Sequence, residues 1–581
     1  MTYYRVKRPF ILGTLSLFLL WNINTAARAF TVDELPQPYS VKDVYPLDDL
    51  TNVNGILFFA SGEQLWRSDG SDAGTYPIAG GASLNGWQPS TLSGSQSGRF
   101  PLELTNFNGT LFYTAVDETG QRGLWQSAGT PASSYLIKNF DGSLESTIYG
   151  LTQFNDELFF NAFTAQTGAE LWRSDGTPEG TVLVKDIQAG NSDPQNLMVV
   201  GNTLFFTAYA GSVPYRQLWK SDGTEAGTVL VQSANTSMIN PAFLTNVNDT
   251  LFFTANSSAE GRELWKSDGT EAGTVLVKAF KTHEDSNLTE LTAAEDTLFF
   301  VHSNNQDGKE LWQSDGSAAG TTFVKQISPP EIPNAYVSLA SIKEYLFFEV
   351  ADKQGRVELW ISDGTVEGIQ LVKGFDAPGS IGDGLGVLKE VNGLLFFSAP
   401  SDDYGHELWR SDGTLEGTVM LGDLNPGLDG SYPNQFTLTD NLLFFAAEST
   451  ADHVELWAFD AALAKFSPES VMVAEGRESV SYEVVLNYQP SSDVTVAIEP
   501  NEDVLVSTPA LQFSRDNWSQ PQTVTITAVN DTQIEGLQVY HLTHLLNGAA
   551  PTHKDLVAGS ITVIVEDDEA TNTIFLPIIL H

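Results

Sequence analysis

A tryptophan that recurs nine times is the feature that most constrains how this chain folds. After a longer first step, the nine residues follow one another at intervals of 46 to 49 positions, and each ends a Glu-Leu-Trp tripeptide or a close variant. They are Trp66, Trp125, Trp172, Trp219, Trp265, Trp312, Trp360, Trp409 and Trp457. A fixed period of this length indicates a repeat architecture in which each copy is one structural unit.

Each copy has the pattern of four short strands. A Leu-Phe-Phe or related tripeptide usually begins 14 residues before the tryptophan, as Leu251 does before Trp265. Side chains alternate along a strand, so this tripeptide puts bulky groups on both faces, and both must be covered. A β-propeller covers them by stacking blades around an axis. We therefore predict an all-β fold with a multi-bladed β-propeller of about nine four-stranded repeats in residues 30–462.

The segment after each tryptophan reads Ser-Asp-Gly-Thr-x-x-Gly-Thr, which is typical of a tight turn with an Asp acceptor and a Gly at positive φ. Eight copies carry the Asp, and the second has Ala128 instead. The eight are Asp69, Asp175, Asp222, Asp268, Asp315, Asp363, Asp412 and Asp460. A ring of these carboxylates could bind cations at one rim, but we favour the interpretation that each supports its own turn.

The copy from Glu170 to Thr177, Glu-Leu-Trp-Arg-Ser-Asp-Gly-Thr, resembles the bacterial ELWxxDGT repeat family, which is related to hyalin-type repeats. The resemblance covers all nine copies and implies a propeller-like region in extracellular proteins. Copy two departs most, with Gly123 for Glu, Ala128 for Asp and no second Gly-Thr. The last copy lacks a fourth strand after Trp457, and residues 39–44 resemble that strand, so we expect the N-terminal strand to close the ring.

The N-terminus is typical of an export signal. Basic residues at positions 5, 7 and 8 precede an apolar run over 10–20 and a small-residue cleavage site at Ala27-Arg28-Ala29. We predict a signal peptide at 1–29 and a secreted or envelope-associated protein. The run is shorter than the roughly 20 apolar residues of a membrane helix, so no integral span is expected after cleavage; uncleaved anchoring is the alternative.

Beyond residue 462 the repeat stops and alternating strands suggest an antiparallel β-sandwich at 463–569. Its segments Val473–Gly476, Phe513–Gln522 and Ile564–Asp568 resemble a Calx-beta domain. That resemblance implies a calcium site with candidate ligands Glu475, Asp531, Glu535, Asp567 and Asp568, and Asp555 as a weaker candidate. Asn530-Asp531 stands where calcium-binding members usually have an Asp-Asp pair. Two alternatives therefore remain for this domain: that it binds calcium, and that it folds without it. The apolar tail at 570–581 is too short to span a membrane; it is a sorting signal, an edge strand or an unordered end.

The charge balance excludes some partners. Asp and Glu number 73 against 29 Lys and Arg, a formal charge of -44, and there is no cysteine. Such a surface repels nucleic acid and attracts divalent cations. Without cysteine the chain has no disulfide, no thiolate nucleophile and no Cys-based metal site.

No catalytic motif stands out. The histidines share no repeat position and no zinc-binding spacing, and His541 and His544 should point to opposite faces of one strand. We therefore predict a non-enzymatic protein for adhesion or communication at the cell surface, with surface glycans or proteins as partners. One alternative is an extracellular polysaccharide hydrolase or lyase, which predicts non-repeating acids, His or Tyr at one mouth of the propeller. Another is a structural surface-layer or matrix protein.

Overall fold

A computed structural model of the chain describes residues 36–78, 101–117, 120–140, 148–211, 213–231, 238–256, 262–280, 287–304, 306–331, 337–351, 356–365, 367–375, 385–449, 453–499, 501–533 and 537–568. The predicted signal peptide, the apolar tail and Glu535 lie outside these residues. The chain divides into two compact units at Asp460 and Ala461, and each is described by itself. Within the described residues, no helix has the length and apolar character needed to cross a membrane.

The described part of the first unit contains nine four-stranded antiparallel sheets, one for each sequence repeat. The first strands of the blades are β2 (Asp48–Val53), β6 (Leu102–Phe107), β10 (Ile148–Phe154), β14 (Gln195–Val200), β18 (Ile239–Val247), β22 (Asn287–Ala294), β26 (Leu339–Ile342), β30 (Lys389–Val391) and β34 (Asn434–Thr439). The second strands, which carry Leu-Phe-Phe, are β3 (Ile56–Ser61), β7 (Thr110–Val116), β11 (Glu157–Thr164), β15 (Thr203–Ala208), β19 (Thr250–Asn256), β23 (Thr297–Asn304), β27 (Tyr345–Ala351), β31 (Leu394–Ser401) and β35 (Leu442–Glu448).

The third strands carry the repeated tryptophan: β4 (Gln64–Ser68), β8 (Arg122–Ser127), β12 (Gly168–Ser174), β16 (Gln217–Ser221), β20 (Glu263–Ser267), β24 (Gly308–Ser314), β28 (Val357–Ser362), β32 (Gly405–Ser411) and β36 (Val454–Asp460). The fourth strands are β5 (Tyr76–Pro77), β9 (Tyr135–Asn139), β13 (Val182–Lys185), β17 (Val229–Leu230), β21 (Val275–Ala279), β25 (Thr322–Ser328), β29 (Gln370–Phe375), β33 (Val419–Met420) and, in blade 9, β1 (Tyr39–Lys42). The predicted multi-bladed propeller is confirmed.

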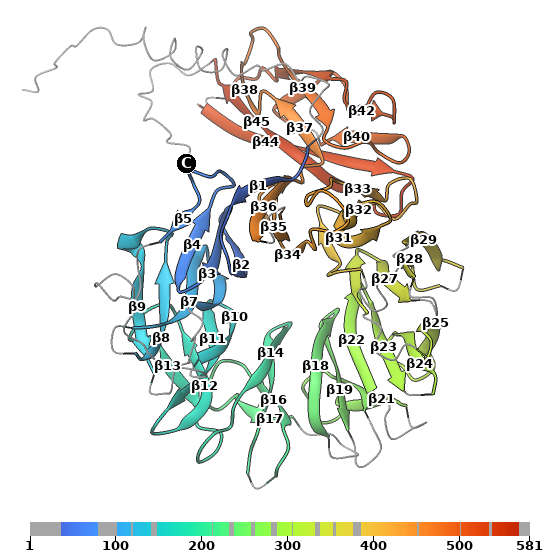
Figure 1. Cartoon of the computed structure of the whole chain (residues 1–581). Coiled ribbons are helices and arrows are strands. Elements are labelled where there is room, and N and C mark those ends of the chain that lie inside the picture. The colour runs from blue at the N-terminus through green and yellow to red at the C-terminus, as the bar shows by residue number, and fades with distance from the viewer. Residues whose placement is uncertain are drawn as a thin grey trace, which may run out of the picture. The chain divides into compact units, whose positions relative to one another are not determined.

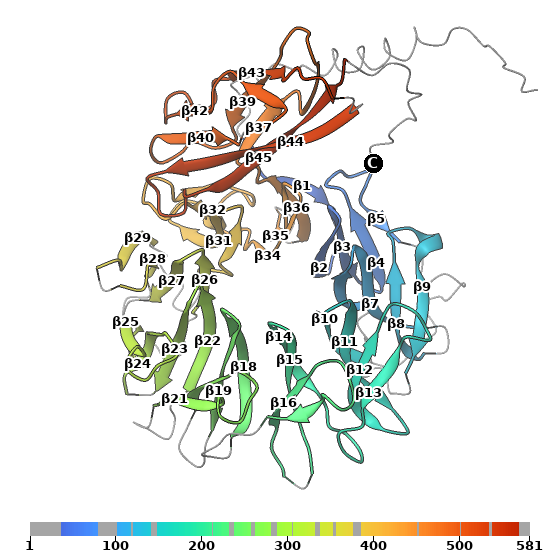
Figure 2. The ribbon, with the colours of Figure 1, turned by 180° about the vertical axis from the view of Figure 1, so that it is seen from behind.

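The N-terminal strand closes the ring, as the sequence predicts. Strand β1 pairs antiparallel with β36, with Tyr39 opposite Ala458, and the two lie side by side in Figures 1 and 2. Blade 9 also bonds to blade 1, because Asn52 donates to the carbonyl of Leu438 at 2.9 Å. The segment that leads into blade 1 is therefore the outer strand of blade 9, and a side-chain bond also joins the two blades.

The Leu-Phe-Phe tripeptide packs each blade against both neighbours. In blade 5, Leu251 and Phe253 share a core cluster with Phe205 of blade 4. The middle residue, Phe252, faces the other way and packs with Phe300 of blade 6. Leu251 and Phe253 are 0% exposed and Phe252 is 4% exposed. Burial on both faces of the second strand is thus the reason for two consecutive aromatic residues in each repeat.

The repeated Asp is used by its own turn. In blade 3, Oδ1 of Asp175 accepts bonds from the backbone N of Thr177 at 2.8 Å and from its hydroxyl at 2.7 Å. These bonds lower the pKa of Asp175. A Cβ on Gly180 would lie 2.0 Å from the same oxygen, which explains the second Gly of the motif. The same backbone bond occurs with Asp69, Asp222, Asp268, Asp315, Asp363 and Asp412, which supports the turn interpretation over a cation-binding rim.

The divergent second copy keeps the turn by a different contact. Ala128 has no carboxylate, but the hydroxyl of Ser133 accepts bonds from the backbone N of Ala128 at 3.1 Å and of Thr130 at 3.0 Å. Ser133 ends a short 3-10 helix, η3 (Pro131–Ser133). A serine at a neighbouring position therefore supplies the acceptor that Asp supplies elsewhere.

The second unit contains two sheets that form a sandwich. One has the order β37 (Ala464–Ser467), β39 (Val480–Leu486), β43 (Gln522–Ala528), β41 (Val504–Val506). The other has the order β38 (Ser470–Ala474), β45 (Leu556–Glu566), β44 (Leu537–Gly548), β40 (Val494–Ile498), β42 (Ala510–Phe513). Pairing is antiparallel except between β38 and β45, which are parallel. The predicted antiparallel sandwich thus holds apart from this pair, and His541 is exposed while His544 is buried, as expected from their spacing.

Candidate functional site

The parallel pair of the sandwich brings two predicted ligands together. Ala474 lies opposite Glu566 in the pairing of β38 with β45. Because parallel strands run in the same direction, the next residue of each strand, Glu475 and Asp567, leaves the sheet at the same edge. The backbone N of Glu475 donates to the carbonyl of Glu566 at 3.0 Å, which extends the pairing to the site.

Three carboxylates converge at this edge. Ligand oxygens of Glu475, Asp567 and Asp568 all lie within 4.8 Å of one another. Glu475 is 5% exposed and Asp567 is 6% exposed, while Asp568 is open to solvent. Two unit charges at this separation repel by about 3 kcal/mol at an effective dielectric constant near 20. A hard cation bound between the oxygens would replace that repulsion with attraction.

The remaining predicted ligands are placed differently. Asp531 approaches the cluster through its backbone, whose N donates to Oε2 of Glu475 at 3.3 Å. Its carboxylate instead accepts a bond from the backbone N of Gln533 at 2.7 Å and supports its own turn. Asp555 directly precedes β45, whose other end leads to Asp567, so it is absent from the cluster. The structure therefore unites three of the five predicted ligands, and Glu535 lies outside the described residues.

Close packing around Gly476 holds the cluster. A Cβ at this position would lie 2.9 Å from Nδ2 of Asn530 and 2.9 Å from Oδ2 of Asp568. Gly476 also has a φ of 62°, which disfavours other residues. The loop carrying Asn530 is thus pressed against the two strand ends, and any larger residue at 476 would displace the carboxylate of Asp568.

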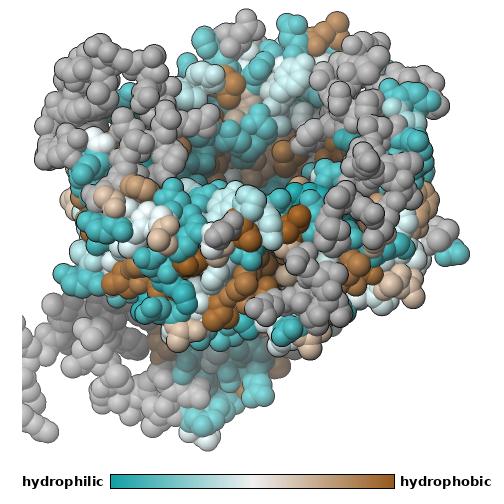
Figure 3. All heavy atoms as spheres, turned by 90° about the horizontal axis from the view of Figure 1, so that it is seen from below, coloured by the Kyte–Doolittle hydropathy of each residue, from teal (hydrophilic) through white to brown (hydrophobic). Residues whose placement is uncertain are grey.

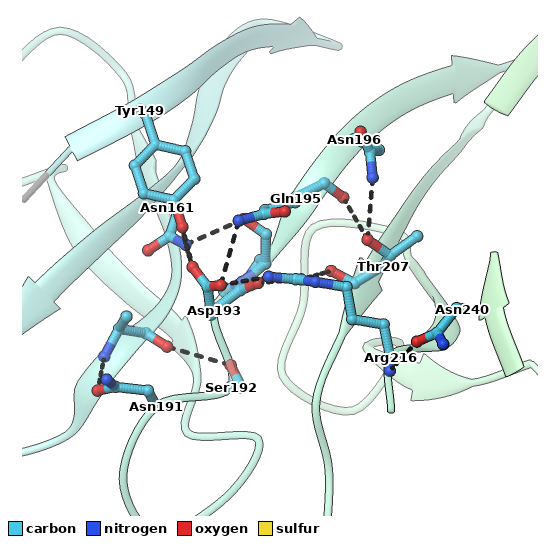
Figure 4. A network of polar contacts seen from close by, with 12 residues as sticks. Tyr149, Asn161, Asn191, Ser192, Asp193, Gln195, Asn196, Thr207, Arg216 and Asn240 are labelled. Atoms are coloured by element: carbon cyan, nitrogen blue, oxygen red, sulfur yellow. Dashed lines mark hydrogen bonds and ion pairs between the residues drawn. The ribbon is translucent and has the colours of Figure 1, made fainter. Parts of the chain in front are cut away.

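A second polar cluster lies in the propeller, between blades 3 and 4 (Figure 4). We call the edge where the chain passes from one blade to the next the crossover edge; the Ser-Asp-Gly-Thr turns lie at the opposite edge. Asp193 lies on the crossover segment between β13 and β14. Its Oδ1 accepts from Tyr149 and from Asn161 at 3.1 Å, and its Oδ2 accepts from Gln195 at 3.1 Å and from Arg216.

Arg216 completes this cluster. Its Nη1 donates to the carbonyls of Asp193 at 2.5 Å and Thr207 at 3.3 Å, and the guanidinium lies 4.6 Å from the ring centre of Tyr209. The repeat pattern did not reveal this cluster, because Asn161 and Arg216 occupy repeat positions but differ there from most copies of the repeat. The available signal was a departure from it: Asn161 stands where the neighbouring blades have Thr114 and Thr207.

The Glu of the Glu-Leu-Trp tripeptide also binds the crossover segment. In blade 3, Oε2 of Glu170 accepts bonds from the hydroxyl of Ser192 at 2.5 Å and from the backbone N of Ile187 at 2.9 Å. In blade 8, Glu407 makes the equivalent bond to Ser431 at 2.6 Å. Burial raises the pKa of Glu170 to about 7 and that of Glu407 above its usual value. These glutamates therefore have a structural role in their blades.

One face of the molecule shows how polar and apolar residues are distributed on it. On the face drawn in Figure 3, hydrophilic residues predominate and hydrophobic ones form small patches between them. This agrees with the excess of 73 acidic over 29 basic residues.

No protein-family model matches the chain, and no curated protein matches it. Among solved structures, it is similar to one described as the eukaryotic initiation factor, with 8% identity, a TM-score of 0.43 and coverage of 66% of this chain and 89% of that one. It is also similar to prolyl oligopeptidase B from Galerina marginata bound to a 25mer macrocyclization substrate, with 14% identity, a TM-score of 0.36 and coverage of 66% and 58%. A puromycin-hydrolyzing peptidase of Mycobacterium tuberculosis has 11% identity, a TM-score of 0.33 and coverage of 65% and 62%.

The chain spans less than two thirds of the length of either peptidase. Likeness at these identities and TM-scores assigns no activity to it. The chain is an all-β protein whose repeats form a multi-bladed β-propeller.

Proposed function

We propose that this chain is a secreted or cell-surface binding protein without catalytic activity, in which the propeller presents a ligand-binding surface and the sandwich is a calcium-binding module. The observation that carries the proposal is the carboxylate cluster of Glu475, Asp567 and Asp568. Two of its members are almost fully buried. Burying like charges together is unfavourable unless a cation neutralises them.

The donor set suits calcium. This ion takes six to eight oxygen ligands, with carboxylates bound through one or both oxygens and water completing the shell. Glu475, Asp567 and Asp568 would hold it, and bound calcium would offset the repulsion between their carboxylates. Glu475 also accepts a bond from the backbone of Asp531, so binding would stiffen the Asn530-Asp531 loop against the strand ends.

A thermal unfolding experiment tests this part of the proposal. The full chain would be heated with calcium, with magnesium and with a chelator, as wild type and as Asp568→Asn, which changes an exposed member of the cluster. Calcium at 100 times its Kd should stabilise the sandwich by about 2.7 kcal/mol and raise its Tm on the order of 10 °C. Asp568→Asn should lose most of this gain, and Asp516→Asn, an exposed acid of the same unit, should keep it. An equal gain in all three proteins, or none in wild type, contradicts the proposal.

The uniformity of the repeats supports a binding role for the propeller over a catalytic one. The residues that recur are used for packing between blades and for turns, as Phe252 and Asp175 show. The predicted export signal, the excess of acidic residues and the resemblance to ELWxxDGT repeats support an extracellular setting. Surface glycans or proteins are the partners that we propose there.

The hydrolase or lyase alternative gains one observation, the polar cluster of Tyr149, Asp193 and Arg216. Both carboxylate oxygens of Asp193 already accept two bonds each. A general base needs a free lone pair toward its substrate, so this arrangement favours a fastening between blades over catalysis. Release of reducing ends from extracellular polysaccharides, abolished in Asp193→Asn, would reinstate the enzyme. Calcium-induced self-assembly, followed by light scattering, would favour the surface-layer alternative.

A further inference from the structure

Four of the few basic residues in this acidic chain occupy one repeat position. Arg122, Arg216, Arg262 and Lys309 each lie three residues before the repeated tryptophan of their blade. In this position the side chain starts at the crossover edge of the third strand. Nη1 of Arg122 and of Arg262 donates to a threonine of the second strand in the same blade, at 2.9 and 3.0 Å.

Three of these four cations have carboxylates beside them. Arg216 pairs with Asp193. Glu103 stabilises the charged form of Arg122, and Glu290 and Glu349 do the same for Lys309. Arg262 differs, because no carboxylate among the described residues pairs with it. Burial lowers the pKa of Arg262, and its guanidinium stays charged because arginine is not deprotonated in proteins.

The missing partner is visible when blades 4 and 5 are compared. Asp193 and Asn240 are equivalent: each directly precedes a proline, and each has a φ of 50°. The carbonyl of Asp193 accepts from Nη1 of Arg216 at 2.5 Å, and that of Asn240 accepts from Nη1 of Arg262 at 3.2 Å. The backbone bond is thus repeated in blade 5.

The side chains at these two positions act differently. The carboxylate of Asp193 turns back to the guanidinium of Arg216. Asn240 carries a neutral amide, and its Oδ1 accepts a bond from the backbone N of Arg216 at 3.1 Å, as Figure 4 shows. The amide of Asn240 is therefore held toward blade 4, and among the residues that the structure describes the guanidinium of Arg262 has no charged partner like that of Arg216.

We propose that Arg262 binds a carboxylate group of a ligand at the crossover edge of blade 5, in the place that the Asp193 carboxylate takes beside Arg216. Only Nη1 of Arg262 bonds to described residues, through Asn240 and Thr254. The side chain is partly exposed. Its remaining donors can form the paired, parallel bonds that guanidinium groups make to carboxylates.

The ligand class that fits is a sugar acid. Phe243 lies three residues beyond Asn240, is 42% exposed and has a φ of 52°, so an apolar ring stands on the same strand. The net charge of -44 opposes long polyanions but acts weakly on a single carboxylate, since surface charges are screened beyond about 8 Å at physiological salt. This inference rests on the proposed role of the propeller as a ligand-binding scaffold.

Saturation-transfer NMR with the full chain tests it, with glucuronate as the probe and glucose as its neutral match. Wild type should give a glucuronate signal that falls at high salt and a much weaker glucose signal. Arg262→Gln should lose at least four fifths of the glucuronate signal. Asn240→Asp, which rebuilds the blade 4 arrangement in blade 5, should also lose it. Arg173→Gln should retain it, because Arg173 lies at the opposite end of its strand, paired with Glu157 at 2.7 Å.

No glucuronate signal in wild type, equal signals from glucose, or an undiminished signal in a folded Arg262→Gln protein would overturn the proposal. Asn240→Asp also serves as a control for loss of the glucuronate signal through misfolding. It adds an ion pair and should leave the propeller as stable as wild type. Calcium binding and envelope binding are measured independently of Arg262, so failure of this inference is distinguishable from failure of the proposed function.

Discussion

Acidification should destabilise the sandwich through one buried histidine. His544 is 0% exposed. Its Nε2 lies 2.8 Å from the hydroxyl of Tyr482, and its Nδ1 lies 3.1 Å from the carbonyl of Leu542. A neutral ring satisfies both, with Nδ1 donating and Nε2 accepting. Burial lowers the pKa of His544 to about 4, whereas histidine in an unfolded chain titrates near 6.5.

The sign and size of the effect follow from these two values. Between pH 4 and 6.5 the unfolded chain binds a proton that the folded chain does not, so stability is complete above pH 6.5 and is lost as the pH falls toward 4. The difference of about 2.5 pKa units corresponds to about 3 kcal/mol at 1.36 kcal/mol per unit. About 2 kcal/mol of this should be lost by pH 5.

Calorimetry of wild type and His544→Gln at pH 7 and pH 5 measures this contribution. Glutamine keeps an acceptor for Tyr482 but has no titration in this range. The sandwich transition of wild type should lose about 2 kcal/mol more than that of the variant between the two pH values, and other titrating groups cancel in the comparison. Equal losses in the two proteins would refute the reasoning.

Three further predictions concern the propeller. Phe253→Ala removes a fully buried ring between blades 4 and 5. It should lower the free energy of unfolding, measured by urea titration, by about 3 to 5 kcal/mol. Phe323 is 47% exposed, so Phe323→Ala should lower it by less than about 1.5 kcal/mol. Gly180→Ala forces a Cβ to within 2.0 Å of Asp175 and should lower the Tm of the propeller, whereas Gly374→Ala, which meets nothing within 4 Å, should not. Ser133→Ala removes the hydrogen-bond acceptor of the turn in the second copy and should lower the free energy of unfolding by about 1 kcal/mol. Adding Ala128→Asp should restore most of this stability. No recovery would contradict the role given to the Ser133 hydroxyl.

The propeller was predictable because its determinants are local and repeat. Leu-Phe-Phe and the Ser-Asp-Gly-Thr turn recur along the chain, and each copy shows the strand with two buried faces and the tight turn that they form. Ring closure was predictable for a related reason, since the last copy lacks the strand that residues 39–44 supply. The second copy shows the limit, because only the structure reveals that Ser133 replaces the absent carboxylate.

The sites were less predictable because they depend on contacts between distant residues. The resemblance named Glu475 and Asp567, but their approach is produced by a parallel pairing of segments about 90 positions apart in the sequence. The side chain of Asp531 supports its own turn, which no spacing rule indicates. Arg216 pairs with Asp193, which lies 23 residues earlier in the sequence. The difference between Arg216 and Arg262 is visible only when the two folded blades are compared.

Co-sedimentation with isolated cell envelopes of the source organism shows whether this chain binds the cell surface in a calcium-dependent way. The mature chain and Asp568→Asn would each be incubated with envelopes in calcium and then in chelator, and the sedimented fraction measured. Wild type should be retained in calcium and released by chelator, and Asp568→Asn should be retained weakly in both. No retention of wild type in calcium, or equal retention of both proteins with chelator present, would contradict a calcium-dependent binding protein.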